Sequence, residues 1–545
     1  MTDEPRQAGD SVDITTQSLV RPAAMMAVGT ALSRLTGVGR VAALVFALGV
    51  TESRLADSYN IANTLPNVLY ELALGGIMTS VFIPILVQEL RTKERKEAWE
   101  SVSVLITTGV AMLLFLTLVA IAIAPWVIEI FSSRVSGPEG ARQQELATFF
   151  LRWFAPQIAL YGLAAMGAAL LNAHGRFALP MFAPILNNVV VIGTFIAFGL
   201  VVSGTPTNET VEASTSLKLL LSLGTTGGVA AMVLVYWPAL RDLPGRVRMR
   251  FDLAHPAVRR LVRLSGWILL YVATNTVGLG VSFYLANDAQ GGATAYITAF
   301  AFFQLPIGIA AISILTALVP KLSAHYVDGE ATSFRARLAG GMRAMVLVML
   351  PATLAFLLLG HPLIEVLLEH GIVGGSSSEL VSSVLAMFAI GLLPFAVFQL
   401  FMRAFYTRQD TRTPALVNVA ENGVTIALDF ALFPSMGVEG LALAHSLGYV
   451  AGCVIAGWIL ARQAGGLELR ATLGESGRIA AASLLAALAI AAVMLGLAEA
   501  ISAGIGRALA QLVLAGGLGV LVFLGASQLL GVKELGTLRR LLPSR

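Results

Sequence analysis

The sequence predicts an all-α, polytopic membrane protein of about fourteen transmembrane helices. Of its 545 residues, 57% are hydrophobic and only 12% are charged, whereas about 25% of an average soluble domain is charged. Apolar runs near twenty residues recur along the chain, each long enough for a helix to cross a hydrocarbon core of about 30 Å. The alternating pattern of membrane β-strands does not occur.

The apolar runs define fourteen spans. They are predicted at residues 23–49, 57–90, 100–128, 146–172, 181–203, 216–240, 258–287, 292–322, 338–360, 380–406, 412–433, 438–461, 474–498 and 505–531. An even number of spans places both termini on one side of the membrane. The polar N-terminal stretch lacks the pattern of a cleaved secretory signal, and we expect it to be a cytoplasmic tail.

Basic residues orient these spans. The loops that follow even-numbered spans contain clusters of Lys and Arg, at 91–96, 241–250, 335–337, 408–412 and 462–470. The loops that follow odd-numbered spans are poor in both, and residues 203–214 contain neither. Because basic loops stay in the cytoplasm, we expect a multi-pass protein with both termini cytoplasmic. The net charge of +4 then reflects topology and does not indicate a nucleic-acid partner.

An internal repeat predicts two lobes. Pro180 and Asn188 of the fifth span are matched by Pro414 and Asn422 of the eleventh, 234 positions further on in both cases. We therefore predict a tail at 1–21, an N-lobe of helices 1–6 at 22–241, a C-lobe of helices 7–12 at 242–463, and helices 13–14 with a cytoplasmic tail at 464–545. Parallel halves of this kind flank a central site in transporters.

Two arginines interrupt the first span. Arg34 and Arg40 lie within an apolar run that also contains two glycines. A charge at the bilayer centre costs about 2.5–3.5 kcal/mol on insertion scales, so such residues usually have a function. Guanidinium donors fit phosphate oxygens, and we predict that Arg34 and Arg40 bind an anionic substrate. The alternative is that both side chains extend to the lipid headgroups.

Two carboxylates of the second span extend this candidate site. Asp57 stands at the start of the span and is equally consistent with a helix cap. Glu71 follows the Leu-Pro-Asn break at 65–67 and precedes a glycine pair. We expect Glu71 to pair with an arginine of the first span.

The eleventh span contains a second polar group. Asn418 and Asn422 are four residues apart and share a helix face with Glu421. Together with Asn275 of the seventh span, they form a candidate site for Na⁺ or a proton, since such cations bind oxygen ligands. The alternative is hydrogen bonding between helices.

The sequence has no pattern for covalent catalysis. It contains no nucleophile–base pair, no Gly-Lys-Ser/Thr phosphate loop and no metal-ligand spacing. Its single cysteine, Cys453, cannot form an intrachain disulfide. We therefore expect a transporter without a bound cofactor, driven by Na⁺ or H⁺ coupling or by the membrane potential.

Several segments resemble the MurJ/MviN lipid II flippases, a family of the multidrug/oligosaccharidyl-lipid/polysaccharide exporter superfamily. Residues 33–40, 56–57, 65–67 and 82–86 are similar to the opening of that family. Residues 171–177 and 403–414 are similar to its signatures before the fifth and eleventh helices. The resemblance covers nearly the whole chain.

The resemblance implies a fold and an activity. The fold would be two six-helix lobes in a V around a cationic cavity, with two C-terminal helices lining a groove for a lipid tail. The activity would be to move lipid II, the undecaprenyl-pyrophosphate-linked disaccharide-peptide of peptidoglycan synthesis, to the outer leaflet of the bacterial cytoplasmic membrane by alternating access. The implied partners are lipid II, membrane lipids, and cell-wall synthesis or division proteins.

The family pattern is matched only in part. Arg34, Arg40 and Asp57 agree with its cavity residues, whereas two further arginines are replaced, one by Tyr70 beside Glu71 and one near Ala301. Either Tyr70 and Glu71 contribute a substitute polar site, or substrate handling differs. The alternatives are an exporter of another lipid-linked oligosaccharide, a cation-coupled drug antiporter and a transport-inactive scaffold for cell-wall synthesis.

Overall fold

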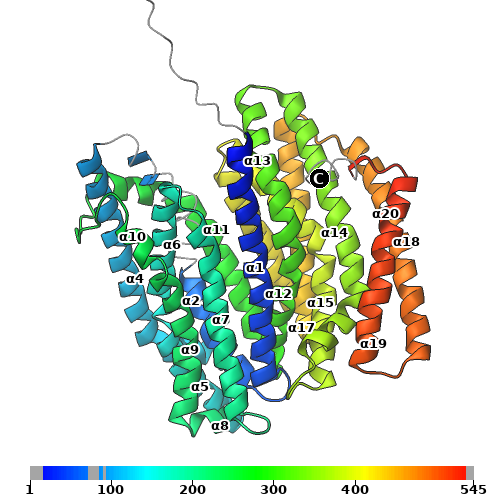
Figure 1. The fold of residues 1–545 in the computed structure, drawn as a ribbon, viewed down its shortest axis with the longest axis horizontal. Coiled ribbons are helices and arrows are strands. Elements are labelled where there is room, and N and C mark those ends of the chain that lie inside the picture. Colours follow the sequence, from blue (N-terminus) through cyan, green and yellow to red (C-terminus); the bar gives the residue numbers. More distant parts are fainter. Residues whose placement is uncertain (1–15, 71–84, 87, 90–93, 535–545) are drawn as a thin grey trace, which may run out of the picture.

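The computed structural model describes residues 16–534 except 71–84, 87 and 90–93 (Figure 1). Within this part of the chain every regular element is a helix, which confirms the predicted all-α class. The helices run nearly side by side in a slab one helix length thick (Figure 1). Such helices satisfy their own backbone hydrogen bonds, as a lipid environment requires.

The N-terminal group of helices forms one side of the molecule. It consists of α1 (Thr16–Leu48), α2 (Leu55–Tyr70), α4 (Arg95–Ser132), α5 (Gly137–Phe154), α6 (Gln157–Ala173), α7 (Ala178–Val201), α8 (Asn208–Glu212), α9 (Thr215–Leu234) and α10 (Trp237–Arg241). Helix α1 packs along α7, and α7 packs in turn on α9.

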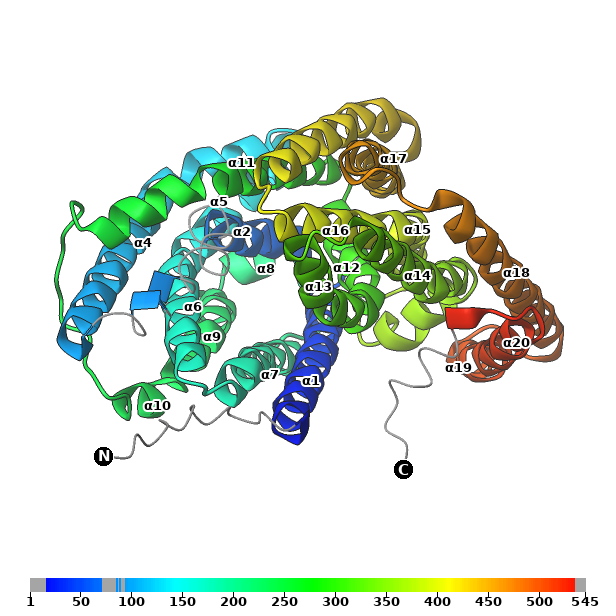
Figure 2. The same cartoon turned by 90° about the horizontal axis from the view of Figure 1, so that it is seen from above.

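The remaining helices form the other side, except that α11 (Pro256–Ala286) begins beside α4 of the N-terminal group (Figure 2). They are α11, α12 (Gly292–Pro306), the π-helical turn η3 (Ile307–Ala311), α13 (Ile312–Val327), α14 (Ala331–Leu368), α15 (Gly375–Ile390), α16 (Leu392–Thr407), α17 (Arg412–Ala464), α18 (Leu469–Ala500), α19 (Ile505–Ala510), the π-helical turn η4 (Gln511–Ala515) and α20 (Gly516–Leu529). Helix α18 packs on α14 and α20, at the edge far from the N-terminal group (Figure 2).

The described helices support most of the predicted spans. Ten are long and apolar enough to cross a membrane, or eleven if the bent pair α15 and α16 counts as one span. The second predicted span continues into undescribed residues, so the total of fourteen stays a prediction. Helix α1 begins and α20 ends at the same end of the molecule (Figure 1), as an even number of crossings requires.

Helix α17 contains two of the predicted spans. Its chain turns at Gly437, which has φ +60° and ψ −137°, a conformation that glycine adopts without steric cost. The two halves then pack closely against each other. Their proximity is shown at Gly448, where an added Cβ atom would overlap the Thr425 hydroxyl. Residues 23 positions apart in a continuous helix would be separated by about 35 Å.

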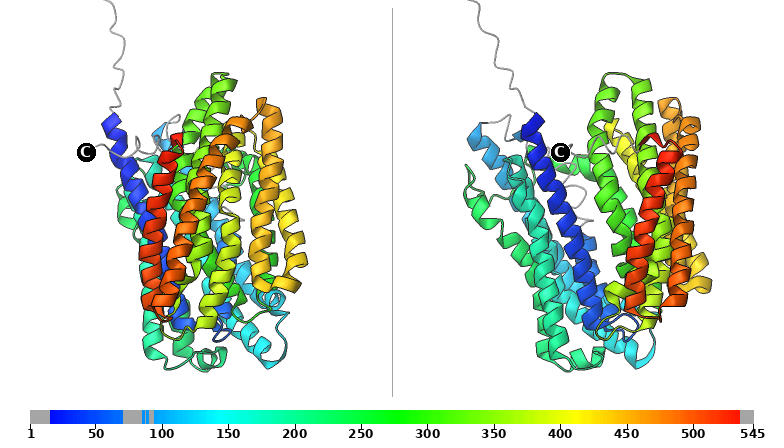
Figure 3. Two further views of the ribbon diagram at one scale, coloured as in Figure 1. Left: turned by 90° about the vertical axis from the view of Figure 1, so that its right-hand side faces the viewer. Right: turned by 45° about the vertical axis from the view of Figure 1, so that its right-hand side comes forward.

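The two lobes meet at one end of the slab and diverge toward the other (Figure 3). The largest apolar core lies where they meet and joins both lobes: it includes Leu48, Phe195, Tyr296 and Phe388. A second core lies within the N-terminal group and also includes Val258 at the start of α11. Helix α11 therefore begins on α4 and continues along α17.

The repeated asparagines occupy matching places in the two lobes. Asn188 of α7 donates to the Thr36 hydroxyl of α1 at 2.9 Å. Its counterpart Asn422 donates to the Asn275 side-chain oxygen of α11 at 3.2 Å. Each asparagine thus bonds to the first helix of its own lobe, which is the arrangement that a parallel repeat predicts.

Close packing of α7 on α9 depends on a glycine. A Cβ atom on Gly224 would lie 2.8 Å from the Thr194 Cβ, whereas one on Gly227 of the same helix would meet no atom within 4 Å. We expect Gly224→Ala to destabilise the protein by about 1–3 kcal/mol, the usual cost of overpacking. Gly227→Ala should be neutral or stabilising, because alanine favours helix. Thermal unfolding of both variants in detergent tests the contrast; equal stabilities would contradict it.

Candidate functional site

Helix α1 lies between the lobes and holds both predicted arginines. It packs against α7 on one side and contacts α12, η3 and α14 on the other. Arg40 follows Arg34 by six positions, which corresponds to about 9 Å along the axis and about 120° around it. The two guanidinium groups therefore leave α1 in different directions.

Arg40 is directed into the N-lobe. Its side chain is half-buried and interacts electrostatically with the phenols of Tyr59 in α2 and Tyr161 in α6. The side chains of Asn67 and Asn187 lie near the Tyr161 hydroxyl. One cation and several hydrogen-bonding groups from α1, α2, α6 and α7 thus gather inside the N-lobe, an arrangement suited to an anionic group.

Arg34 lies against the C-lobe. A Cβ atom on Gly308, in the π-helical turn η3, would lie 3.0 Å from the Arg34 Nε. The absence of a side chain on Gly308 leaves room for the arginine, whose own side chain is exposed. One cation of α1 therefore borders each lobe.

The positions that replace the two missing arginines have different surroundings. The Tyr70 ring at the end of α2 lies 5.8 Å from the Tyr161 ring, centre to centre. It therefore adjoins the polar group around Arg40. Ala301 is a half-buried residue of α12, seven positions before Gly308. Glu71 lies outside the described residues, so its pairing with an arginine stays a prediction.

Asp57 joins the two lobes. Its carboxylate is fully buried and accepts hydrogen bonds from the backbone N–H of Gly291 at 2.7 Å and of Thr294 at 2.9 Å. It also accepts one from the Thr294 hydroxyl at 2.7 Å. These bonds make Asp57 a helix cap, but it does not cap its own span as the sequence suggested. The helix that it caps is α12 of the opposite lobe.

Neighbouring residues of α2 strengthen this junction. Arg54 donates to the carbonyl oxygens of Asn287 at 2.8 Å and Asp288 at 2.9 Å, just after the end of α11. Asn60 donates to the Thr294 hydroxyl at 3.1 Å. Arg54, just before α2, and Asp57 and Asn60 in its first turns therefore hold both ends of the α11–α12 connection.

A second contact joins the loop between α1 and α2 to the C-lobe. The Glu52 carboxylate accepts from the Gly374 N–H and the Ser377 hydroxyl, both at 2.8 Å. The Thr51 N–H donates to the Ser377 Oγ at 3.0 Å. We call these contacts of residues 51–60 with the C-lobe the outer latch, because the charge pattern predicts that this end faces outside. Glu52 and Tyr161 could not be identified from the sequence, since each is a single polar residue whose partners are distant in the chain.

The predicted cation site forms as a cluster inside the C-lobe. The Asn422 amide donates to the Asn275 oxygen at 3.2 Å and to the Glu421 carboxylate at 2.6 Å. Thr425 donates to the other oxygen of Glu421 at 3.2 Å. Asn418 is 1% exposed, and its amide nitrogen has no hydrogen-bond partner among the described residues. Asn275, Glu421 and Asn422 therefore meet through their side chains, and Asn418 joins them through its carbonyl oxygen, which accepts from the Asn422 amide at 3.0 Å.

Buried acidic charge in this lobe lacks a basic partner. Glu421 is 2% exposed and Asp429 is fully buried, and neither forms an ion pair with a described residue. Asp429 accepts from the Ser282 hydroxyl at 2.8 Å, while its second oxygen has no described partner. Burying a carboxylate without compensation is costly, so a cation or a proton would stabilise this cluster.

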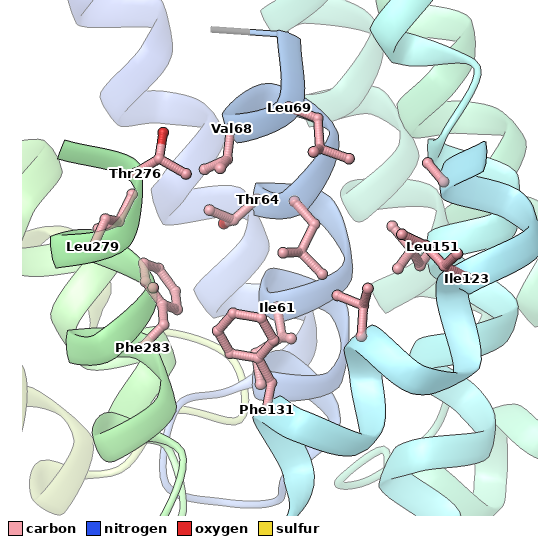
Figure 4. A pocket seen from close by; sticks show the side chains of 14 residues that line it. Ile61, Thr64, Val68, Leu69, Ile123, Phe131, Leu151, Thr276, Leu279 and Phe283 are labelled. Atoms are coloured by element: carbon pink, nitrogen blue, oxygen red, sulfur yellow. The ribbon is translucent and has the colours of Figure 1, made fainter. Parts of the chain in front are cut away.

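An apolar cavity of about 200 Å³ lies on the seam between the lobes (Figure 4). It is enclosed by α2, α4, α5 and α11, and Ile61, Leu279 and Phe283 point into it (Figure 4). Its lining offers almost no hydrogen-bond donors to an anion. None of the residues around Arg40 lines this cavity, so the two are separate.

Comparison with known proteins shows one family over most of the chain. Residues 45–513 match the family described as lipid II flippase MurJ. A probable lipid II flippase MurJ of Rhizobium meliloti is 27% identical over 449 residues, which cover 81% of this chain and 79% of that protein. A lipid II flippase MurJ of Burkholderia cenocepacia is 28% identical over 423 residues, covering 77% and 79% respectively.

Solved structures share the fold. A structure titled lipid II flippase MurJ, inward closed conformation, has a TM-score of 0.74 at 19% identity, covering 93% of this chain and 98% of that one. An inward-facing multidrug resistance transporter of the MATE family and MOP superfamily has a TM-score of 0.62 at 12% identity. The match covers 80% of this chain and 99% of that one. At these identities the likeness concerns the fold alone.

Proposed function

Because this chain belongs to the lipid II flippase MurJ family, we propose that it moves lipid II across the membrane into which its apolar helices insert. Lipid II would be the transported substrate, taken from the inner leaflet of the bacterial cytoplasmic membrane and released to the outer leaflet. The protein changes no covalent bond in this scheme. The observation that carries the proposal is α1, which lies between two lobes and presents one arginine beside each of them.

The pyrophosphate of lipid II would bind along α1. Arg40, together with Tyr161 and Asn67, offers charged and neutral donors to phosphate oxygens. Charge-assisted hydrogen bonds of this kind are roughly twice as strong as neutral ones. Arg34 would contact another part of the anionic headgroup from the side of η3. Substrate bound between these arginines contacts both lobes and so responds to their relative movement.

Alternating access would proceed by breaking and reforming the outer latch. The lobes diverge toward the end at which α1 begins (Figure 3), and the basic loops assign that end to the cytoplasm. Both termini would accordingly be cytoplasmic. In this state the hydrogen bonds of Asp57, Arg54 and Glu52 keep the outer end closed.

The Glu421 cluster would couple this movement to an ion. Asn275 belongs to α11, and Asn418, Glu421 and Asn422 belong to the first half of α17. A Na⁺ ion or a proton bound there would neutralise Glu421 and fix α11 against α17. Because α11 also contacts α4 of the N-lobe, the occupancy of the site could bias the angle between the lobes.

The decisive experiment replaces both arginines in cells depleted of the native protein. We expect Arg34→Ala with Arg40→Ala to abolish complementation. Each lost arginine–phosphate hydrogen bond costs about 1.5–3 kcal/mol, at least roughly tenfold. The amount of outer-leaflet lipid II cleaved by a membrane-impermeant enzyme should fall accordingly.

A matched control uses Arg337→Ala with Arg470→Ala, which removes two exposed arginines of the C-terminal half and should complement. Unchanged outer-leaflet lipid II on depletion, with full complementation by the Arg34/Arg40 double variant, would refute the flippase proposal. Complementation that survives every such substitution indicates a scaffold. Altered drug sensitivity that depends on the α17 carboxylates indicates an antiporter.

A further inference from the structure

The connection between the lobes has an unusual composition. From residue 246 to 253 the sequence reads Arg-Val-Arg-Met-Arg-Phe-Asp-Leu, so charged and apolar residues alternate. This linker has no helical structure and runs along the outer face of the N-lobe past α4 (Figure 2). Successive side chains of an extended segment point in opposite directions. The alternation therefore places the apolar side chains on one side of the linker and most of the charged ones on the other.

The backbone of the linker is held against α4. The N–H of Arg248 donates to the Ser103 hydroxyl at 3.0 Å, and the N–H of Arg250 donates to the Thr107 hydroxyl at 3.2 Å. A Cβ atom on Gly245 would overlap the Trp99 ring, so the chain approaches α4 as closely as glycine allows. The linker is therefore a fixed part of the surface.

Large apolar side chains project from this surface. Met249 is 97% exposed, and Phe251 and Leu253 are each 61% exposed. In the membrane they would face acyl chains near the cytoplasmic interface, since α4 begins with Arg95 and Lys96. Exposed apolar groups of this size mark a contact surface when they adjoin one another.

Phe251 and Leu253 border an apolar cavity of about 330 Å³. Its wall is formed by α4, α6, the linker and the first turns of α11, including Leu105, Met112, Phe115, Met166, Phe251 and Val262. The volume lies within the range of about 300–1,000 Å³ that is usual for small-molecule sites. The lining is almost wholly apolar and therefore suits a hydrocarbon chain.

Exposed arginines are next in sequence to residues that line the cavity. Val258 and Val262 of α11 line it, and Arg259 and Arg263 each follow one of them in the sequence. Both arginines are exposed, as are Arg246, Arg248 and Arg260. Of the arginines between 246 and 263, only Arg250 forms an ion pair with a described residue, Glu100. The other arginines of this stretch pair with no carboxylate of the part of the chain that the structure describes.

We propose that this surface binds an anionic phospholipid of the cytoplasmic leaflet. One acyl chain would fill the cavity, and the phosphate would lie between the linker arginines and Arg259 and Arg263. The site lies on the outer face of the N-lobe, apart from α1, and its ligand is a bilayer lipid instead of the transported substrate. Because α11 contacts α4 here and α17 further on, bound lipid would hold α11 to the N-lobe.

Native mass spectrometry of the delipidated full-length protein tests this directly. The probes are phosphatidylglycerol and phosphatidylcholine with identical acyl chains. We expect the wild type to retain phosphatidylglycerol at least about fivefold more, since each basic residue near an anionic headgroup contributes about that factor. Arg259→Gln with Arg263→Gln should remove most of this preference. Ala111→Trp, which fills the cavity, should reduce retention of both lipids.

The control is Arg337→Gln with Arg470→Gln, which removes the same charge from exposed positions elsewhere and should leave the preference intact. Equal retention of the two lipids by the wild type overturns the proposal. So does an equal loss in the control variant. Displacement of phosphatidylglycerol by an undecaprenyl-pyrophosphate lipid would assign the surface to the substrate and overturn it as well. None of these measurements depends on flipping, so the proposal can fail while the flippase function stands.

Discussion

Replacing Asp57 with alanine will open the outer end of the molecule. The carboxylate is fully buried and accepts three hydrogen bonds at the start of α12. Hydrogen bonds to charged groups contribute about 1.5–3 kcal/mol each. Even if other contacts compensate partly, we expect the balance between closed and open outer ends to shift by about 2 kcal/mol or more, at least roughly 30-fold.

A cysteine at Ala293, a fully buried residue beside the latch, reports this opening in a chain that carries Cys453→Ala. Its labelling by a membrane-impermeant maleimide added from outside should accelerate at least about tenfold with Asp57→Ala. Asp288→Ala is the matched control. That carboxylate lies on the same connection but is 40% exposed, and its partner is Arg134. Equal labelling rates in the two variants would show that Asp57 does not hold the lobes together.

Replacing Glu421 with glutamine will abolish the response of the C-lobe to cations. The substitution keeps the size of the side chain and removes the buried charge that lacks a basic partner. If Na⁺ binds to the wild type at one hundred times its dissociation constant, it stabilises the folded state by about 2.7 kcal/mol. The unfolding temperature in NaCl should therefore exceed that in choline chloride for the wild type, and the two should be equal for Glu421→Gln.

Glu439→Gln provides the comparison on the same helix. Glu439 is half-buried and accepts from Ser383 at 2.8 Å, away from Asn275 and Asn422. This variant should keep the full Na⁺ effect. A Na⁺ effect that persists in Glu421→Gln would rule out the cluster as the sodium site. A wild type that responds to pH and not to Na⁺, with the response lost in Glu421→Gln, would identify a proton site.

The sequence by itself determined the class of the protein and its local groupings. Apolar runs, basic loops and residues four positions apart on a helix are properties of short segments. The all-α membrane fold and the neighbourhood of Asn418, Glu421 and Asn422 therefore followed without coordinates. The repeat also located the asparagines that bond to the first helix of each lobe.

Only the tertiary structure decided which distant residues meet. Asp57 has its partners 234 and 237 positions away, so its role in joining the lobes could not be read from the surrounding sequence. Arg34 and Arg40, predicted as one pair, border different lobes, because the helical rotation between them sets their directions and the packing of α1 sets what lies there. Local spacing determines which face a side chain occupies, and the packing of helices far apart in the chain determines what that face contacts.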